Sequence, residues 1–252
     1  MLAGQRPEGD PLAQHCGEAQ KALIPIHGRS MLARVCSALL ESPAISRIVI
    51  LAQETDQLAQ GLEPPLAQDA KISFASSGSG IAASIAEVAG GKAAPWPVLV
   101  TTADHALLTS AMVHDFLSQT EDADLSIAVG ERRIVEAAFP ATRRTWLKFS
   151  DGHYSGANMF ALRGAEVVPA LKLWSGVEQD RKRGLAIMAR FGPYLLLRAL
   201  TRTIGFAAAL KRAGARLGLT AKPVIMPQAD AVIDVDKIAD LELVTAILAE
   251  RE

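Results

Sequence analysis

The chain has 252 residues, of which half are hydrophobic and 21% charged, and its formal net charge is −1. This composition excludes a disordered chain and allows one sizeable core. Two cysteines, Cys16 and Cys36, are too few for a disulfide framework or a zinc site, and no apolar run reaches the ~18 residues that span a bilayer. No signal peptide is recognisable at the start, so we expect a cytoplasmic protein.

The near-zero net charge hides a basic block. Between Arg132 and Arg216 there are 16 Lys or Arg and 5 Asp or Glu residues, whereas the remainder has 10 and 22. Such a block indicates an anionic partner, which could be a phosphorylated small molecule, a membrane surface or nucleic acid, although solvated helix faces would also account for it. Nucleic acid is disfavoured because no recognised binding motif accompanies the block.

Short β-branched runs alternate with helical patterns over the first two thirds of the chain, which is typical of crossover connections in a parallel sheet. A helix is expected over 28–40, where apolar residues recur with helical spacing. Further helices are expected at 81–88 and 110–117. The expected strands of this part are 47–52, 71–75, 97–102 and 125–129.

The pattern then changes. Residues 144–149 alternate with a period of two, and Asp151-Gly152 is typical of a hairpin turn before a strand at 158–162. Residues 165–218 look helical, with a break at Gly192-Pro193. The last expected elements are short strands at 223–226 and 231–235 and a helix at 238–250.

The opening segment carries candidate phosphate ligands. Gly4 lets the backbone approach a ligand closely, Arg6 offers a guanidinium fork, and Lys21 stands just before an apolar run. Fixed cations of this kind stabilise the charge that develops on an α-phosphate and on departing pyrophosphate during nucleotidyl transfer. The first strand is expected to be very short, since only Met1 and Leu2 precede Ala3, and a start upstream of Met1 would explain this.

Four short motifs of this segment together resemble the opening of the molybdenum-cofactor-type NTP transferases. They are Leu2-Ala3-Gly4 with Arg6, Asp10-Pro11-Leu12-Ala13, Lys21-Ala22-Leu23-Ile24-Pro25 and Gly28-Arg29-Ser30-Met31-Leu32. The family has the Rossmann-like glycosyltransferase A fold. The resemblance therefore implies this α/β fold. Because the sequence shows no internal repeat and no low-complexity linker, we expect one domain over 1–252. Its open, mostly parallel Rossmann-like sheet, of the nucleotide-diphospho-sugar transferase type, would carry a late antiparallel hairpin and a helical insertion at about 165–218.

The same resemblance implies that Gly4, Arg6 and Lys21 bind the nucleotide phosphates. We also expect the nucleotide to lie near Ala3 and Gln5, and its base or ribose near the loop of Ser77, Gly78 and Ser79. Two departures from the family pattern stand out: Gln5 replaces the usual second glycine of the loop, and the connection to the lysine is longer than in the compact enzymes.

Two aspartates are candidate ligands for Mg²⁺. Asp104 follows the apolar strand expected at 97–102, and ligands bind at such strand ends in open α/β sheets. Asp236 matches the first aspartate of a late segment in sugar-type nucleotidyltransferases, and that resemblance implies a second metal ligand, with Asp234 as the alternative. Either aspartate could instead cap the helix that follows it. Two such carboxylates opposite a lysine would form a clamp for a Mg–NTP complex.

The basic block contains the candidate acceptor site. A Gly-x-Asn strand after a hairpin lines the acceptor pocket in related transferases, so Gly156 and Asn158, together with Arg144, are candidates here. An ordinary exposed hairpin is the alternative. Residues 181–212 form a basic, amphipathic stretch that would suit an anionic membrane surface, a lid over the site or a homodimer face.

The sequence thus favours an enzyme that transfers NMP from an NTP, with CTP or GTP favoured, to a phosphorylated small-molecule or lipid-headgroup acceptor. A nucleotide-sugar-dependent glycosyltransferase is one alternative, although the Asp-x-Asp that it predicts is replaced by Thr102-Ala103-Asp104. The other is a non-catalytic nucleotide-binding protein at the membrane surface.

Overall fold

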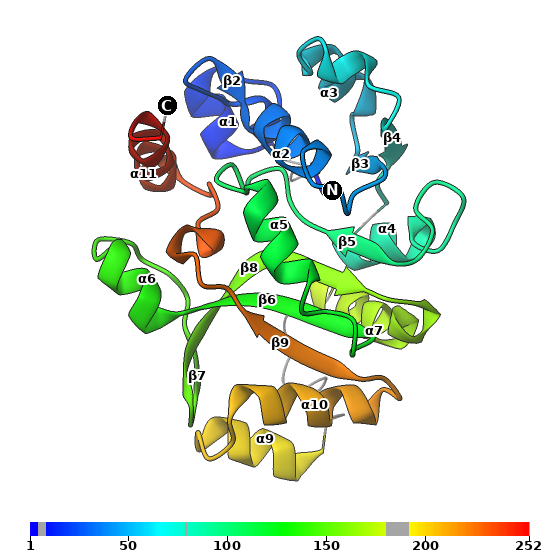
Figure 1. Ribbon diagram of the computed structural model, residues 1–252, viewed down its shortest axis with the longest axis vertical. Coiled ribbons are helices and arrows are strands. Elements are labelled where there is room, and N and C mark those ends of the chain that lie inside the picture. Colours follow the sequence, from blue (N-terminus) through cyan, green and yellow to red (C-terminus); the bar gives the residue numbers. More distant parts are fainter. Residues whose placement is uncertain (5–8, 79, 180–191, 252) are drawn as a thin grey trace. The chain divides into compact units, whose positions relative to one another are not determined.

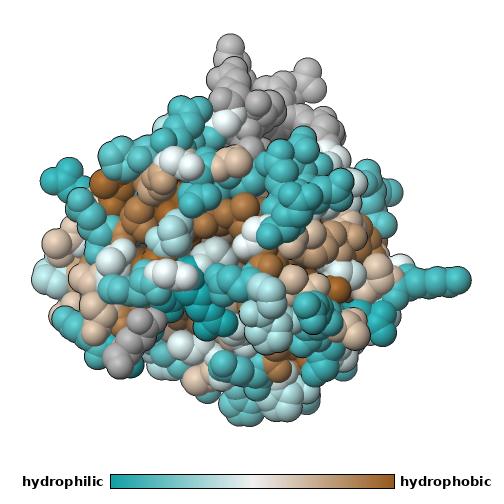
Figure 2. Space-filling view, turned by 90° about the horizontal axis from the view of Figure 1, so that it is seen from above, coloured by the Kyte–Doolittle hydropathy of each residue, from teal (hydrophilic) through white to brown (hydrophobic). Residues whose placement is uncertain are grey.

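The computed structural model describes residues 1–4, 9–78, 80–179 and 192–251, and Figure 1 shows their helices and strands. The chain divides into two compact units. The first comprises Met1–Ser77, Val100–Asp115 and Ile233–Glu252, and the second comprises Gly78–Leu99 and Phe116–Val232. Polar residues cover much of the face shown in Figure 2, where apolar residues reach the surface in separate patches. Over the described residues, no helix combines the length and apolar character needed to cross a membrane.

The first unit is built around parallel strands. Strand β3 (Ile48–Ala52) is buried along its whole length and pairs in parallel with β4 (Ile72–Ser76). On its other side Leu2 makes parallel bridges both to Leu51 of β3 and to Thr102. The segment 1–3 therefore lies between two strands that are far apart in the sequence. This short segment serves as the expected first strand.

Helices and turns complete the first unit. Helix α2 (Met31–Leu40) is capped by Ser30, whose hydroxyl accepts a hydrogen bond from the Ala33 N–H at 3.2 Å, and it buries seven of its ten residues. The other elements of this unit are α1 (Pro11–Cys16), η1 (Lys21–Leu23), β1 (Pro25–Ile26), β2 (Arg29–Ser30), α3 (Thr55–Gly61), η2 (Leu66–Gln68), most of α5 (Ser110–Leu117) and α11 (Ile238–Ala249).

The second unit contains a mixed sheet in the order β5-β8-β6-β9, with β7 paired to β8. Strand β6 (Leu125–Glu131) pairs antiparallel with β8 (Gly152–Leu162) and parallel with β9 (Ala221–Ile225). The remaining elements are α4 (Ile81–Val88), β5 (Val98–Val100, which ends in the first unit), α6 (Arg132–Ala138), β7 (Leu147–Phe149), η3 (Ala165–Val167), α7 (Val168–Gln179), α9 (Pro193–Leu200), α10 (Phe206–Arg216) and η5 (Ala229–Val232).

The predicted fold is confirmed: an open, mostly parallel α/β sheet with a late antiparallel hairpin, formed by β7 and β8 around Asp151-Gly152. The strand predicted at 231–235 is wrong. Residues 229–232 form the 3₁₀ turn η5, and the apolar side chains that suggested a strand, such as Val232 and Ile233, are buried by packing without a ladder. Helices α1, α3 and α6 were not predicted, because each is only six or seven residues long.

Candidate active site

Lys21 is held in place by the turn structure around it. Helix α1 is capped by Asp10, whose Oδ1 accepts hydrogen bonds from the backbone N–H groups of Leu12 at 2.9 Å and Ala13 at 3.2 Å. After this helix the buried Gln20 donates from its side-chain amide to Gln57 Oε1 at 3.0 Å, and η1 starts at Lys21. The lysine side chain is 15% exposed. The backbone that carries the Lys21 side chain is therefore held in place by hydrogen bonds shortly before this residue.

Asp104 lies just beyond the strand end where a ligand was expected. Leu2 N–H donates to Thr101 O at 2.8 Å and Ala103 N–H donates to Leu2 O at 2.8 Å, which fixes this chain segment against residues 1–3. The Thr102 hydroxyl then donates to Asp104 Oδ1. The alternative role as a helix cap is wrong for Asp104, because α5 starts only at Ser110 and the Met112 N–H bonds to Thr109 Oγ1.

Asp236 is positioned by its neighbours on both sides. The Val235 N–H donates to the carbonyl oxygen of Asp104 at 3.0 Å, so the backbone brings the second aspartate next to the first. Asp240 Oδ2 accepts from the N–H groups of Asp236 and Lys237, both at 3.2 Å, at the start of α11. The alternative that Asp236 caps this helix is wrong, since Lys237 occupies the N-cap position and Asp240 supplies the carboxylate. The Asp236 side chain is 64% exposed and does not cap α11, so its carboxylate can contact Lys21.

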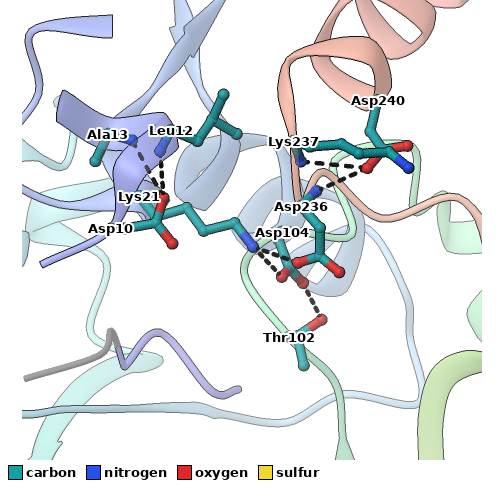
Figure 3. Close-up of polar contacts among 9 residues, drawn as sticks. All are labelled: Asp10, Leu12, Ala13, Lys21, Thr102, Asp104, Asp236, Lys237 and Asp240. Carbon is teal, nitrogen blue, oxygen red and sulfur yellow. Dashed lines mark hydrogen bonds and ion pairs between the residues drawn. The ribbon is translucent and has the colours of Figure 1, made fainter. Parts of the chain in front are cut away.

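The three side chains converge, as Figure 3 shows. Lys21 Nζ donates to Asp104 Oδ2 at 2.8 Å and to Asp236 Oδ1 at 2.7 Å. All three residues belong to the first unit. Burial acts to lower the pKa of the Lys21 ammonium, but the negative charge of Asp104 and the hydrogen bonds to both aspartates outweigh it, so the pKa lies above its ordinary value. Lys21 therefore stays protonated at neutral pH, and one positive charge faces two negative ones.

This donor set suits Mg²⁺. The ion is usually held in proteins by one or two carboxylates and takes its other ligands from water and substrate phosphates. Asp104 and Asp236 both reach a single nitrogen, so their oxygens are close enough to share one small cation. Within the described ranges no group of three or more His, Cys, Asp or Glu side chains gathers as a closed metal site. A magnesium ion bound here would therefore keep positions open for phosphate oxygens.

The other nucleotide candidates are placed only in part. Ala3 is buried and its N–H donates to Leu51 O at 2.9 Å. At Gly4 a Cβ atom would come within 3.0 Å of Gln53 Oε1, so the glycine allows the backbone to pass this side chain closely. Gln5, Arg6 and Ser79 lie outside the described residues.

The loop after β4 is divided between the two units. In the first unit, the Ser77 N–H donates to Ala52 O at 2.8 Å. In the second, the Gly78 N–H donates to Ser84 Oγ at 2.8 Å. Each end of the loop is thus anchored to a neighbouring element, and its contact with a nucleotide stays a prediction.

The acceptor candidates belong to the second unit. Gly156 and Asn158 lie on β8, where the pairing with β6 shifts its register between Ile127 and Val129. Asn158 has a positive φ of 48°, a conformation that is uncommon outside glycine. Strained backbone of this kind often occurs at binding sites, which agrees with the predicted role of Asn158 without testing it. Arg144 lies on the segment before β7.

Sequence reasoning missed the residues that orient the two aspartates. Thr102 was noted only as part of a strand end, yet its hydroxyl bonds to Asp104. Asp240 was considered only for its effect on the helix dipole, yet it holds the backbone at Asp236. A hydroxyl two residues before a strand-end aspartate, and an aspartate four residues after another, are signals that could have identified them.

The chain is similar to a known protein family and to solved structures. The family model of the MobA-like NTP transferase domain matches residues 12–189. A hypothetical transferase from Thermus thermophilus is 29% identical, with a TM-score of 0.79, and the match covers 95% of this chain and 96% of that one. No curated protein sequence matches the chain.

Two more distant structures share the fold. The CMP:2-keto-3-deoxy-manno-octonic acid synthetase, solved with CTP, is 14% identical with a TM-score of 0.60, over 100% of this chain and 98% of that one. The 4-diphosphocytidyl-2C-methyl-D-erythritol synthase of Anaerococcus prevotii is 11% identical with a TM-score of 0.55, over 90% and 93%. Since the family model spans well over half of its residues, this chain belongs to the MobA-like NTP transferase family.

Proposed function

We propose that this protein is a Mg²⁺-dependent nucleotidyltransferase, which transfers NMP from an NTP to a phosphorylated acceptor and releases pyrophosphate. The observation that carries the proposal is the position of Lys21 Nζ between Asp104 and Asp236, at 2.8 and 2.7 Å. CTP and GTP are the favoured donors. CTP is the first to test, since the names of two proteins with this fold contain CTP or a diphosphocytidyl group.

The reaction requires positioning and charge more than proton transfer. An acceptor phosphate oxygen would attack the α-phosphate in line, and the bond to the departing pyrophosphate would break. A phosphate oxygen is already ionised at neutral pH, so no side chain has to act as a base. When bound by Asp104 and Asp236, Mg²⁺ would neutralise charge on the phosphates.

Three further contacts of the protein would support the proposed transfer. Thr102 orients Asp104 through its hydroxyl, and Asp240 holds the backbone from which Asp236 projects. Lys21 keeps its proton because both carboxylates raise the pKa of its ammonium above the ordinary value, against the effect of burial. It therefore remains a fixed cation next to the phosphates, where negative charge grows in the transition state.

The test is pyrophosphate release from each of the four NTPs with Mg²⁺ and candidate phosphorylated acceptors. A thermal-shift screen, in which CTP is tested first, shows which of these NTPs bind, because a ligand that binds the native state raises the melting temperature. Release should be lost in Asp104→Ala and retained in Asp56→Asn, which changes an exposed aspartate on α3. Equal turnover in Asp104→Ala would defeat the assignment. Calorimetric NTP binding without release, for every acceptor tried, would favour a non-catalytic nucleotide-binding protein instead.

A further inference from the structure

Helix α9 exposes a row of large apolar side chains. Tyr194 is 64% exposed, Leu197 59% and Leu200 67%. Their spacing of three residues places them on one side of the helix. They are the three most exposed large hydrophobic residues of the described chain. Such a concentration on one eight-residue helix indicates a surface that meets a partner.

Cations surround this row. Over residues 192–216 there are five Lys or Arg residues and no Asp or Glu. The guanidinium carbons of Arg198 and Arg212 lie 5.8 and 5.9 Å from the centre of the Tyr194 ring. Arg202, Lys211 and Arg212 are exposed. An aromatic ring with arginines around it, next to leucines, is the composition of an interfacial helix.

The neighbouring helix provides a rigid support. Helix α10 contacts α9 and packs on β9, so closely that a Cβ atom at Gly214 would lie 2.8 Å from Leu219 O and 2.9 Å from the Ala221 Cβ. At its start, Phe206 is buried against Tyr154 and Val129. Phe206 of α10 thus belongs to the core of the second unit, whereas Lys211 and Arg212 on the same helix are exposed. Helix α10 lies next to α9 (Figure 1).

We infer that this α9–α10 surface, formed by Tyr194, Leu197, Leu200, Arg198, Arg202, Lys211 and Arg212, docks on an anionic lipid bilayer. The leucines and the tyrosine would enter the boundary between headgroups and acyl chains, and the cations would contact acidic headgroups. This inference is independent of the proposed reaction, since all of its residues lie outside the Lys21, Asp104 and Asp236 site.

A second copy of this chain and nucleic acid both fit this surface less well. In a symmetric dimer the same patch would face itself, so its cations would be set against the same cations of a second copy, and residues 192–216 contain no acid to pair them. Nucleic acid would satisfy the cations, but its phosphate backbone would leave Leu197 and Leu200 exposed to water. A bilayer with acidic headgroups accommodates both the charge and the apolar row.

The experiment is co-sedimentation of the full chain with vesicles. One set contains phosphatidylcholine alone and the other phosphatidylcholine mixed with an equal amount of phosphatidylglycerol. We expect binding to the mixed vesicles only, weakened by added salt. Leu197→Ser/Leu200→Ser should abolish it, and Lys211→Gln/Arg212→Gln should weaken it by about fivefold for each cation, the factor that corresponds to ~1 kcal/mol. Arg133→Gln and Ile238→Ser, which change an exposed cation and an exposed apolar residue elsewhere, should bind like the wild type.

Each other result overturns the inference. Sedimentation with neither vesicle, or equally with both, would do so, as would unchanged binding of the two double variants. Light scattering that shows a dimer which the leucine variant breaks would assign the surface to a second copy. Retention on a DNA duplex in preference to the mixed vesicles would assign it to nucleic acid. If the leucine variant fails to fold by circular dichroism, the charge variant alone decides.

Discussion

The backbone N–H of Val235 donates a hydrogen bond to the backbone carbonyl oxygen of Asp104, 3.0 Å away. This bond joins two segments that are 131 positions apart in the sequence, and it places Asp236 beside Asp104 by main-chain contact. The main-chain bond does not depend on either carboxylate, so it should persist when one of them is substituted. Variants at Asp104 or Asp236 still remove a counter-charge of Lys21, so their activity is to be compared with their stability.

Thr102→Val should lower turnover by about tenfold, the usual lower bound for losing a residue that orients a metal ligand. The variant keeps the shape of the side chain but removes the hydroxyl that donates to Asp104 Oδ1. Steady-state pyrophosphate release measures the effect, and Thr102→Ser, which restores the hydroxyl, should recover most of the activity. If Thr102→Ser is as slow as Thr102→Val, the hydroxyl does not act through Asp104.

Asp240→Ala should raise the Mg²⁺ concentration that gives half-maximal activity and should cost about 1 kcal/mol of stability, as expected for a lost helix cap. The reason is that Asp240 Oδ2 accepts from the N–H groups of both Asp236 and Lys237. Magnesium titrations and denaturant unfolding measure the two effects. Glu242→Ala removes an exposed acid from the same helix and is the control. A stability loss with an unchanged magnesium response would limit Asp240 to a structural role.

Lys21→Met should slow turnover and lower the free energy of unfolding at neutral pH by about 1–2 kcal/mol, since two carboxylates lose their counter-charge. The pKa of the Lys21 ammonium in the folded protein lies above its ordinary value of 10.5, because the two aspartates outweigh burial. Its contribution to stability is thus fully present below the unfolded pKa and is lost as the pH rises through the folded pKa.

The measurement for Lys21 is the difference in unfolding free energy between wild type and variant, followed from neutral to alkaline pH. It should shrink only above pH 10.5. Lys222→Met, which removes the partner of the exposed Asp122, should show a smaller difference at neutral pH. A difference between wild type and Lys21→Met that does not change with pH would mean that the stability comes from packing of the side chain and not from its charge.

Asn158→Gly separates backbone strain from binding. A positive φ of 48° costs a non-glycine residue up to about 1 kcal/mol, so the glycine variant should be as stable as the wild type or more so. If the side chain binds the acceptor, the KM for the acceptor should rise while the KM for the NTP stays constant. Asn158→Ala keeps the strain and should be less stable than Asn158→Gly. An unchanged acceptor KM in Asn158→Gly would remove this residue from the acceptor site.

Periodicity predicted most of the larger elements because their patterns are local. The buried run of β3 and the helices over 81–88 and 110–117 lie where the sequence placed them. The strand expected at 231–235 failed because apolar residues can be buried in a turn as well as in a sheet. Asp10 followed by Pro11 is typical of a helix start. Helix α1 was nevertheless not predicted, because its six residues are too few to show a helical pattern.

The sequence pointed to the three residues that meet at the candidate site, but it could not predict the hydrogen bonds among them. Asp104 and Asp236 were identified by strand end and by resemblance, whereas their shared contact with Lys21 depends on long-range folding. The orienting roles of Thr102 and Asp240 follow from a backbone path that no local pattern encodes.

The first unit is assembled from three separate stretches of chain, and each stretch contributes one of Lys21, Asp104 and Asp236. Asp236 is the last of the three along the sequence, 132 positions after Asp104. The charge cluster is therefore complete only when all three stretches are present and folded together. Any chain truncated before residue 236 would therefore lack the cluster, however well the rest of it folds.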